Sequence, residues 1–308
     1  MLRVIAFIST YILSITLTWA QVKSEAILIK NDSIELPGTL TYSDKDTDLV
    51  IWVHGSGNVD RNGNQAGLNV GANYIKQFRD NINKEGIAFF SYDKRTANRN
   101  NMKFLLKKLT FDDLVVDVKK VIAYFRKDDR FKKITLIGHS QGSLVAMLAY
   151  ADADKYISLA GPSESIDATI VGQVTKQNAE LGKTTAAHFK ELKETGEIKE
   201  VNPMLLSIFA KPNLPFFKSW MQYDPSEKIK EVSIPTLIIN GDKDIQVSVE
   251  DAKQLHASKK DGALKIIKNM NHVIKHIEKD ADNIPSYRSP DFPISNELVT
   301  IIAMFIKQ

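Results

Sequence analysis

The sequence predicts an α/β protein with a mostly parallel central sheet, helices on both faces of that sheet, and an insertion made only of helices. Three observations support this fold class. Short apolar runs alternate along the chain with segments of helical apolar spacing, which is typical of βα units. Most of these runs are continuously apolar, as expected for strands buried on both faces. One long interval interrupts the alternation and contains only helical patterns.

A β-hairpin is expected to precede the parallel strands. Residues 24–30 and 34–42 alternate apolar and polar side chains, and Asn31-Asp32 between them is a common turn sequence. The elements expected next are a buried strand at 49–53, a helix at 72–83, a second buried strand at 87–92 and a helix at 111–125.

A strand, a tight turn and a helix are expected within residues 132–150. Residues 134–137 have the β-branched composition of a strand, and the apolar run after residue 143 has helical composition. Ser140 stands alone at the apex of the turn, with Gly138 and Gly142 two residues away on either side. This is the G-x-S-x-G pattern, in the strand–turn–helix context in which it presents a nucleophile.

The two glycines of this turn have a mechanical reason. A serine on so sharp a turn has a strained backbone, and a Cβ on either glycine would collide with the strand and helix around it. The turn lifts the Ser140 hydroxyl clear of the sheet and leaves the backbone N–H of Gln141 free to bind an oxyanion. If the turn works in this way, an acid, a base and a second oxyanion donor are required elsewhere, in a fixed chain order.

The strand rhythm stops after a strand expected at 156–160. We interpret residues 162–231 as a helical cap inserted into a core formed by residues 21–161 and 232–308. The expected cap helices are 166–181, 185–195 and a segment 204–223 that is interrupted at Pro212 and Pro215. The elements expected after the cap are a strand at 236–240, a helix at 249–258, a strand at 263–267 and a final helix at 296–307.

The last segment of the cap is rich in large apolar side chains. They form either a wall that binds an acyl or aromatic group of the substrate, or the core of the cap itself, since a helix must bury one face. The residues concerned are Leu205, Leu206, Ile208, Phe209, Phe216, Phe217, Trp220, Met221 and Tyr223.

The acid of the site is expected just after the strand that follows the cap. Asp244 lies three residues beyond Gly241, which ends that strand, so the loop can turn its carboxylate back over the edge of the sheet. Asp242 is the alternative, with a local capping or pairing role expected for it.

The base is expected after the following strand. His272 comes directly after residues 263–267 and Asn269-Met270-Asn271, which places it at the sheet edge that also carries Ser140. His276 is the alternative base, while His188 in the cap and His256 on a later helix are expected to be solvated. The order Ser140, Asp244, His272 is the chain order of the hydrolase triad built around a G-x-S-x-G turn.

The second oxyanion donor is expected in the loop after the first buried parallel strand. That loop reads His54-Gly55-Ser56-Gly57, and its two glycines, Gly55 and Gly57, let the backbone approach a substrate closely. We choose the backbone N–H of Ser56 as the donor, with that of Gly57 next. His54 is expected to be a structural histidine that bonds the backbone of the loop.

Several short segments together carry a resemblance to a known family. They are Trp52-Val53-His54-Gly55-Ser56-Gly57, Asp60-Arg61, Tyr92-Asp93-Lys94-Arg95, Gly138-His139-Ser140-x-Gly142, Gly241-x-x-Asp244 and Asn271-His272. On these residues the chain resembles the α/β-hydrolases, and among them the bacterial serine aminopeptidase and esterase-like group with an inserted cap. The resemblance implies the α/β-hydrolase fold and acyl-transfer chemistry. Asn58 and Thr96 stand where that group often has proline and glycine, which bears on how a substrate fits.

The residues together predict a serine hydrolase that cleaves carboxylic esters of small or medium acyl groups through an acyl-enzyme. The expected partner is therefore a small ester or a short peptide. A serine peptidase is the enzyme alternative, and a binding protein on a hydrolase scaffold is the second. No cofactor or metal is expected: His272 and His276 are four residues apart, but no carboxylate ligand stands between them.

The N-terminal segment, the net charge and the cysteine content bear on location and partners. Arg3 precedes an apolar stretch and then Thr18-Trp19-Ala20, so residues 1–20 are predicted to be a signal peptide cleaved after Ala20, with an uncleaved anchor as the alternative. The mature protein is then exported, to the periplasm or outside the cell, and is not held by a membrane. The net charge of +4 is spread among alternating lysines and acids, so no nucleic-acid partner is expected. The chain has no cysteine and therefore no disulfide.

Overall fold

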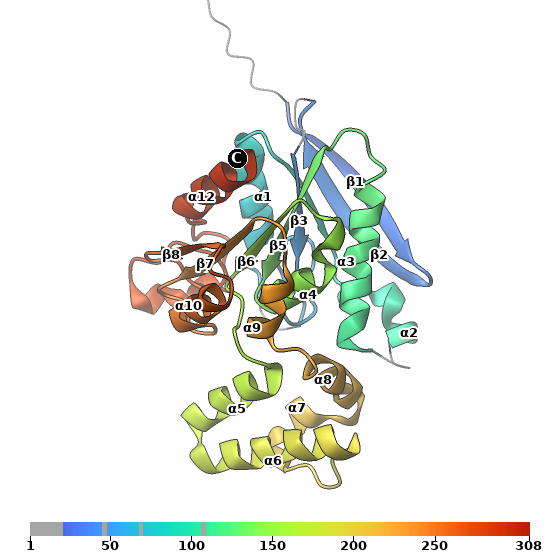
Figure 1. Cartoon of the computed structure of the whole chain (residues 1–308), viewed down its shortest axis with the longest axis vertical. Helices are drawn as coiled ribbons and strands as arrows, with labels where there is room; N and C mark the ends of the chain where they lie inside the picture. The colour runs from blue at the N-terminus through green and yellow to red at the C-terminus, as the bar shows by residue number, and fades with distance from the viewer. Residues whose placement is uncertain (1–20, 45–47, 68–69, 106–108) are drawn as a thin grey trace, which may run out of the picture.

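The computed structural model describes residues 21–44, 48–67, 70–105 and 109–308 (Figure 1). Residues 1–20, where a signal peptide is predicted, lie outside the described part. Within these ranges, no helix combines the length and the apolar character that spanning a membrane would need.

Eight strands of the described residues form a single sheet, in the order β1-β2-β4-β3-β5-β6-β7-β8. The hairpin β1–β2 is antiparallel and pairs antiparallel with β4, whereas every later pair of neighbours is parallel. The bounds are β1 Lys23–Asn31, β2 Ile34–Tyr42, β3 Asp48–Val53, β4 Ala88–Tyr92, β5 Lys133–His139, β6 Lys155–Leu159, β7 Thr236–Gly241 and β8 Ala263–Ile267. Because parallel neighbours end at the same edge, the loops after β3 to β8 meet there.

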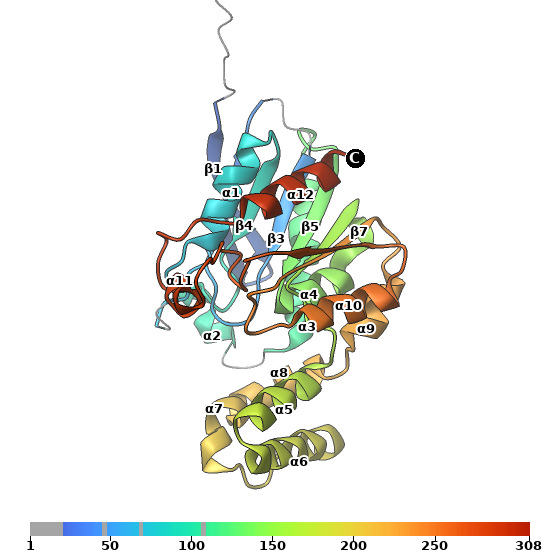
Figure 2. The ribbon, with the colours of Figure 1, turned by 90° about the vertical axis from the view of Figure 1, so that its left-hand side faces the viewer.

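Helices cover both faces of the sheet (Figures 1 and 2). The core clusters show which lie where: α1 Tyr74–Lys84 and α12 Asn296–Lys307 pack on one face, and α3 Phe111–Phe125, α4 Gln141–Ala149 and α10 Val249–Ser258 pack on the other. Strand β3 shows why its run is continuously apolar, since Ile51 and Val53 join one cluster and Val50 and Trp52 the other. The remaining helices of this larger unit are α2 Met102–Leu105, α9 Pro225–Lys228 and α11 Asn283–Ser286.

A separate helical layer lies beyond the sheet, as Figure 2 shows. It consists of α5 Ile166–Gln177, α6 Ala179–Thr195, α7 Leu206–Phe209 and α8 Leu214–Trp220, and it has a small apolar core of its own. The helix α9 and the 3-10 turn Ile229–Glu231 fall within the range expected for the cap, yet they contact α10 of the larger unit.

Two details of this layer differ from the sequence prediction. The first helix ends at Gln177, because the Asn178 side chain accepts a hydrogen bond from Leu181 N and begins the second helix there. The predicted break after residue 181 is therefore wrong. Pro212 and Pro215 lie in the first turns of a 3-10 turn and of α8, where proline is favoured. The predicted interruption of segment 204–223 is present, but it falls at Ala210, just before them.

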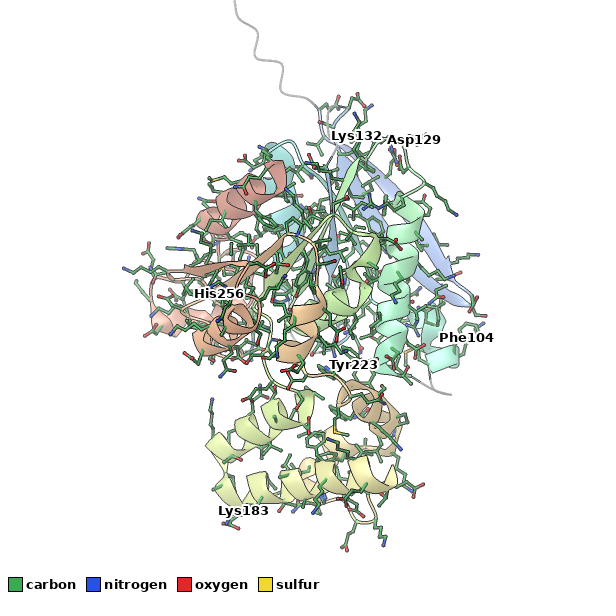
Figure 3. All side chains as sticks on the ribbon, in the orientation of Figure 1. Phe104, Asp129, Lys132, Lys183, Tyr223 and His256 are labelled. Carbon is green, nitrogen blue, oxygen red and sulfur yellow. The ribbon has the colours of Figure 1, made fainter. Side chains whose placement is uncertain are left out.

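The helical layer docks on the first turn of α3. The rings of Trp220 and Phe111 stack with centres 5.0 Å apart, and Ser219 Oγ accepts a hydrogen bond of 2.7 Å from Phe111 N. Tyr223, which Figure 3 labels where the two units meet, donates a hydrogen bond to Asp112. These contacts hold α8 beside the loops at the carboxyl edge of the sheet.

A buried ion pair anchors the loop after β4 to α3. Arg95 donates to both carboxylate oxygens of Asp117, at 2.6 and 2.8 Å, and Asn31 donates a third bond to Asp117. The two charged side chains are 5% and 3% exposed. Asp113, which is more exposed, contacts the same guanidinium at 3.1 Å.

Replacing Asp117 with alanine would leave the Arg95 guanidinium buried with only Asp113 for a partner. We expect Asp117→Ala to lower the free energy of unfolding by about 3 kcal/mol, the low end of the range for breaking a buried pair, because Asp113 remains. Urea unfolding followed by circular dichroism measures this. Glu180→Ala, which removes the solvent-exposed partner of Lys183, is the control and should leave the stability nearly unchanged. Equal effects of the two substitutions would contradict the assigned role of the pair.

Candidate active site

Ser140 occupies the turn between β5 and α4. Its φ of 55° and ψ of −124° lie in a region that a residue with a side chain rarely adopts. Strand β5 runs on to His139, past its predicted end, so the serine follows the strand immediately. A Cβ on Gly138 would lie 2.4 Å from Gly142 O, and a Cβ on Gly142 would lie 2.2 Å from Val53 O. Neither position has room for a side chain.

A buried hydroxyl network supports the turn from beneath. Ser143 Oγ, in the first turn of α4, lies 2.7 Å from Tyr156 Oη and 2.8 Å from Ser158 Oγ, both on β6. The N–H of Ser140 also donates to Leu159 O at 2.9 Å. The start of α4 is thus tied to the neighbouring strand, which holds the strained residue in place.

Asp244 and His272 are brought together by the loops after β7 and β8. Asp244 Oδ2 lies 2.7 Å from His272 Nδ1, and the two side chains are 0% and 6% exposed. The other carboxylate oxygen accepts the backbone N–H groups of Gln246 and Val247 at 2.8 and 2.9 Å. A neutral His272 that donates through Nδ1 keeps a lone pair on Nε2 to accept a proton.

The competing residues lie in other surroundings. Asp242 accepts a hydrogen bond of 2.6 Å from Asn269 N, in the loop after β8. His276 Nε2 lies 3.7 Å from Glu278, and 39% of the His276 side chain is exposed. Half-buried His256 lies on α10 (Figure 3). The expectation that His188 is solvated is wrong: it is 8% exposed, and its Nε2 accepts a bond of 3.1 Å from Asn202 N.

The loop that carries His272 is held by two neighbours that were part of the family resemblance but had no role assigned to them. His139 Nε2 donates to the backbone carbonyl of His272 at 2.8 Å, which joins the nucleophile turn to the loop of the base. Burial lowers the pKa of His139 to about 3, so it stays neutral near pH 7. Asn271, which is buried, donates to Ser286 Oγ at 2.8 Å and to Asn283 Oδ1 at 3.1 Å.

The loop after β3 passes directly against Ser140. A Cβ on Gly55 would lie 3.1 Å from Ser140 Cβ, and Ser56 and Gly57 line the same cavity as Ser140. Gly57 has φ of 89°, which favours glycine. His54 is buried and packs edge-on against Tyr92, with ring centres 5.0 Å apart. Neither of its ring nitrogens makes a hydrogen bond of normal geometry, but the backbone of Asp60 in the same loop interacts with the ring and opposes the lowering of the His54 pKa by burial.

Lys94 is a buried lysine beside this loop. It was part of the family resemblance, but nothing in its sequence context indicated a role. Its Nζ donates to Gly55 O at 2.8 Å and to Gln141 Oε1 at 2.7 Å. Burial lowers its pKa to about 7, although the carboxylate of Asp117 acts in the opposite direction. Lys94 thus links the loop after β3 to the start of α4.

A cavity of about 650 Å³ opens between these loops and the helical layer. Ser140, Gln141, His272 and Lys94 line its floor, and Phe216, Phe217 and Trp220 of α8 line the opposite wall. The large apolar residues of the insertion therefore have different surroundings, and Leu206 is 54% exposed. Leu205, Phe209 and Met221 lie in the core of the helical layer. None of the described residues that line the cavity carries a carboxylate.

The parts of the chain that the structure describes contain no group of three or more His, Cys, Asp or Glu side chains placed to hold a metal ion.

Solved structures share this architecture. The esterase Pf2001 of Pyrococcus furiosus superposes with a TM-score of 0.60 at 17% identity, covering 92% of this chain and 90% of that one. Est1E from Butyrivibrio proteoclasticus superposes with a TM-score of 0.56 at 17% identity, covering 92% and 99%. At these identities the likeness is one of fold, and it confirms the predicted α/β-hydrolase fold.

Sequence comparison gives the family. Residues 39–258 match the BD-FAE family, and the chain belongs to it. A curated relative, esterase EstD of Thermotoga maritima, is 28% identical over 228 residues, which are 70% of this chain and 52% of that protein. The chain thus spans about half the length of the curated relative it matches.

The low pKa of Lys94 makes stability depend on pH with a definite sign. Between its folded pKa of about 7 and the unfolded value of about 10.4, the unfolded chain binds more protons, so stability rises with pH. From pH 7 to pH 9.5 the wild type should gain about 3 kcal/mol of unfolding free energy relative to Lys94→Met, which has no such proton. Urea unfolding of both proteins at the two pH values measures this. A difference that stays constant with pH would show that Lys94 keeps its proton throughout.

Proposed function

We propose that the protein is a serine hydrolase that cleaves carboxylic esters of small or medium acyl groups. One observation carries the proposal. The 2.7 Å contact between Asp244 and His272 lies at the cavity into which the strained Ser140 turn also faces. A carboxylate, an imidazole and a serine in this chain order, on this fold, are the parts that acyl transfer through a serine requires.

The proposed reaction begins with transfer of the Ser140 hydroxyl proton to Nε2 of His272 as Oγ attacks the ester carbonyl. Asp244 holds the ring in the required tautomer and stabilises the imidazolium that forms. The backbone N–H groups of Ser56 and Gln141 stabilise the oxyanion of the tetrahedral intermediate. His272 then protonates the leaving alcohol, and a water molecule repeats the sequence on the acyl-enzyme.

The lining of the cavity supports an ester over the amino-terminal end of a peptide. A free amino group needs a carboxylate to bind it, and none of the described lining residues supplies one. A neutral ester needs no such partner. The wall formed by Phe216, Phe217 and Trp220 suits an apolar or aromatic group of the substrate. Est1E, of the same fold, has been solved with ferulic acid bound, which is in keeping with an aromatic acyl group here.

A series of p-nitrophenyl esters of increasing acyl length, run beside aminoacyl-nitroanilides, tests the proposal on wild type and Ser140→Ala. We expect turnover of the esters and a loss of at least about 10⁴-fold in kcat for Ser140→Ala and His272→Ala, because the nucleophile and its base act as a unit. His276→Ala is the matched control and should retain activity. A fluorophosphonate probe should label the wild type and spare Ser140→Ala.

Two results would overturn these assignments. Absence of Ser140-dependent turnover of both substrate classes, together with no labelling by the probe, would exclude the hydrolase. Activity that survives in His272→Ala and is lost in His276→Ala would exclude His272 as the base.

We also propose that the protein is exported, with cleavage after Ala20 and a mature chain that begins at Gln21. Arg3, the apolar run after it and the small residues Thr18 and Ala20 support this. Expression of the full chain, fractionation of the cells and intact mass measurement test it. The exported fraction should have the mass of residues 21–308. A full-length chain confined to the membrane fraction would contradict cleavage.

A further inference from the structure

The two loops proposed to supply the oxyanion donors are joined by one buried amine. Lys94 follows β4, Gly55 follows β3, and Gln141 begins α4 after β5. In the sheet β3 lies between β4 and β5, so Lys94 reaches across a strand end to contact both. Its Nζ donates to Gly55 O and Gln141 Oε1 at 2.8 and 2.7 Å, and its side chain is buried.

We propose that Lys94 is a positioning residue that orients both backbone amides of the oxyanion hole. The inference rests on the hydrolase function proposed above and goes beyond it, because Lys94 belongs to neither the triad nor the donor pair. It acts through the backbone carbonyl of Gly55 and the side-chain amide of Gln141.

The contact with Gly55 controls the amide of Ser56. Gly55 C=O and Ser56 N–H belong to one peptide unit, which is planar, and no peptide bond of the described chain is cis. In a trans peptide the two groups point in opposite directions. The hydrogen bond from Lys94 to the Gly55 carbonyl therefore directs the N–H of Ser56 away from Lys94. A hydrogen bond to the carbonyl also polarises the peptide and makes its N–H a better donor.

The contact with Gln141 controls the second donor. The N–H of Gln141 is at the first position of α4, directly after Ser140, and its side chain is 3% exposed. Fixing Oε1 fixes the rotamer of this residue and ties it to the loop of Ser56. Lys94 thus connects the two residues that carry or adjoin the two amides. A neutral lysine has two N–H groups for these two acceptors, so positioning does not require the charge.

The test is the second-order rate constant with which a fluorophosphonate labels Ser140 in Lys94→Met. This probe needs no knowledge of the natural substrate, and its phosphoryl oxygen needs the oxyanion donors. We expect the labelling rate constant and the kcat for esters to fall about 10- to 100-fold, which is no more than the effect of removing a whole oxyanion donor. KM should stay within about threefold of the wild-type value. The labelled fraction at completion counts folded sites, so a folding defect lowers the end point and not the rate per site.

Lys155→Met is the matched control. Lys155 is also buried, and its Nζ donates to two backbone carbonyls, Phe305 O and Ile306 O at 2.7 and 2.8 Å, but it does not line the cavity. We expect wild-type labelling from it. Lys94→Gln, which is polar and too short to span both acceptors, is a second variant in case Lys94→Met does not fold, and it should show the same loss per site.

The outcomes separate the two proposals. A wild type that is not labelled and hydrolyses no ester refutes the hydrolase itself. A wild type that reacts through Ser140, with Lys94→Met and Lys94→Gln labelled at the wild-type rate per site, leaves the hydrolase standing and overturns the role of Lys94. The role is also overturned if KM alone changes, or if Lys155→Met loses as much as Lys94→Met.

Discussion

The packing of the first turn of α4 against the end of β3 is the constraint on which the site depends. Gly142 approaches Val53 O so closely that a side chain would overlap it, and Gly138 meets the same turn from β5. This approach places Ser140 beside Gly55, in the loop that follows β3. His272 then reaches the same cavity, with Asp244 bonded to its Nδ1, because β7 and β8 are parallel and end at the same edge. A fold that changed the approach would separate every member of the site.

The site is strained, and its surroundings hold the strain. Ser140 and Ile274, two residues after the proposed base, both have positive φ, and such residues cost on the order of 1–3 kcal/mol each. Buried hydrogen bonds oppose relaxation on both sides. Ser143 bonds to β6 beside Ser140, and Asn271 bonds to the segment after β8 beside His272. His139 connects the two halves through His272 O. The geometry is therefore imposed by the fold before any substrate arrives, as preorganised catalysis requires.

The sequence predicts the features of the site that depend on neighbouring residues, and few of those that depend on contacts between distant residues. Apolar runs, glycine spacing and chain order were sufficient to predict the sheet, the Ser140 turn and the candidates Asp244 and His272, because each signal lies within a few residues. Lys94 and His139 act on residues 39 to 133 positions away, through side-chain bonds that exist only once β3, β4 and β5 are neighbours. No periodicity records such contacts. The break at Asn178 was missed because its capping role depends on one side-chain bond, and the division of the cap's apolar residues depends on how α8 docks on Phe111.

The structure of the protein after reaction with a fluorophosphonate would test the central claim most directly, since the adduct resembles the tetrahedral intermediate. We expect phosphorus bonded to Ser140 Oγ, with the phosphoryl oxygen about 2.7–3.1 Å from the backbone nitrogens of Ser56 and Gln141. We also expect that Lys94 Nζ still contacts Gly55 O and Gln141 Oε1. An adduct on another residue, or a phosphoryl oxygen that faces away from these two amides, would contradict the claim.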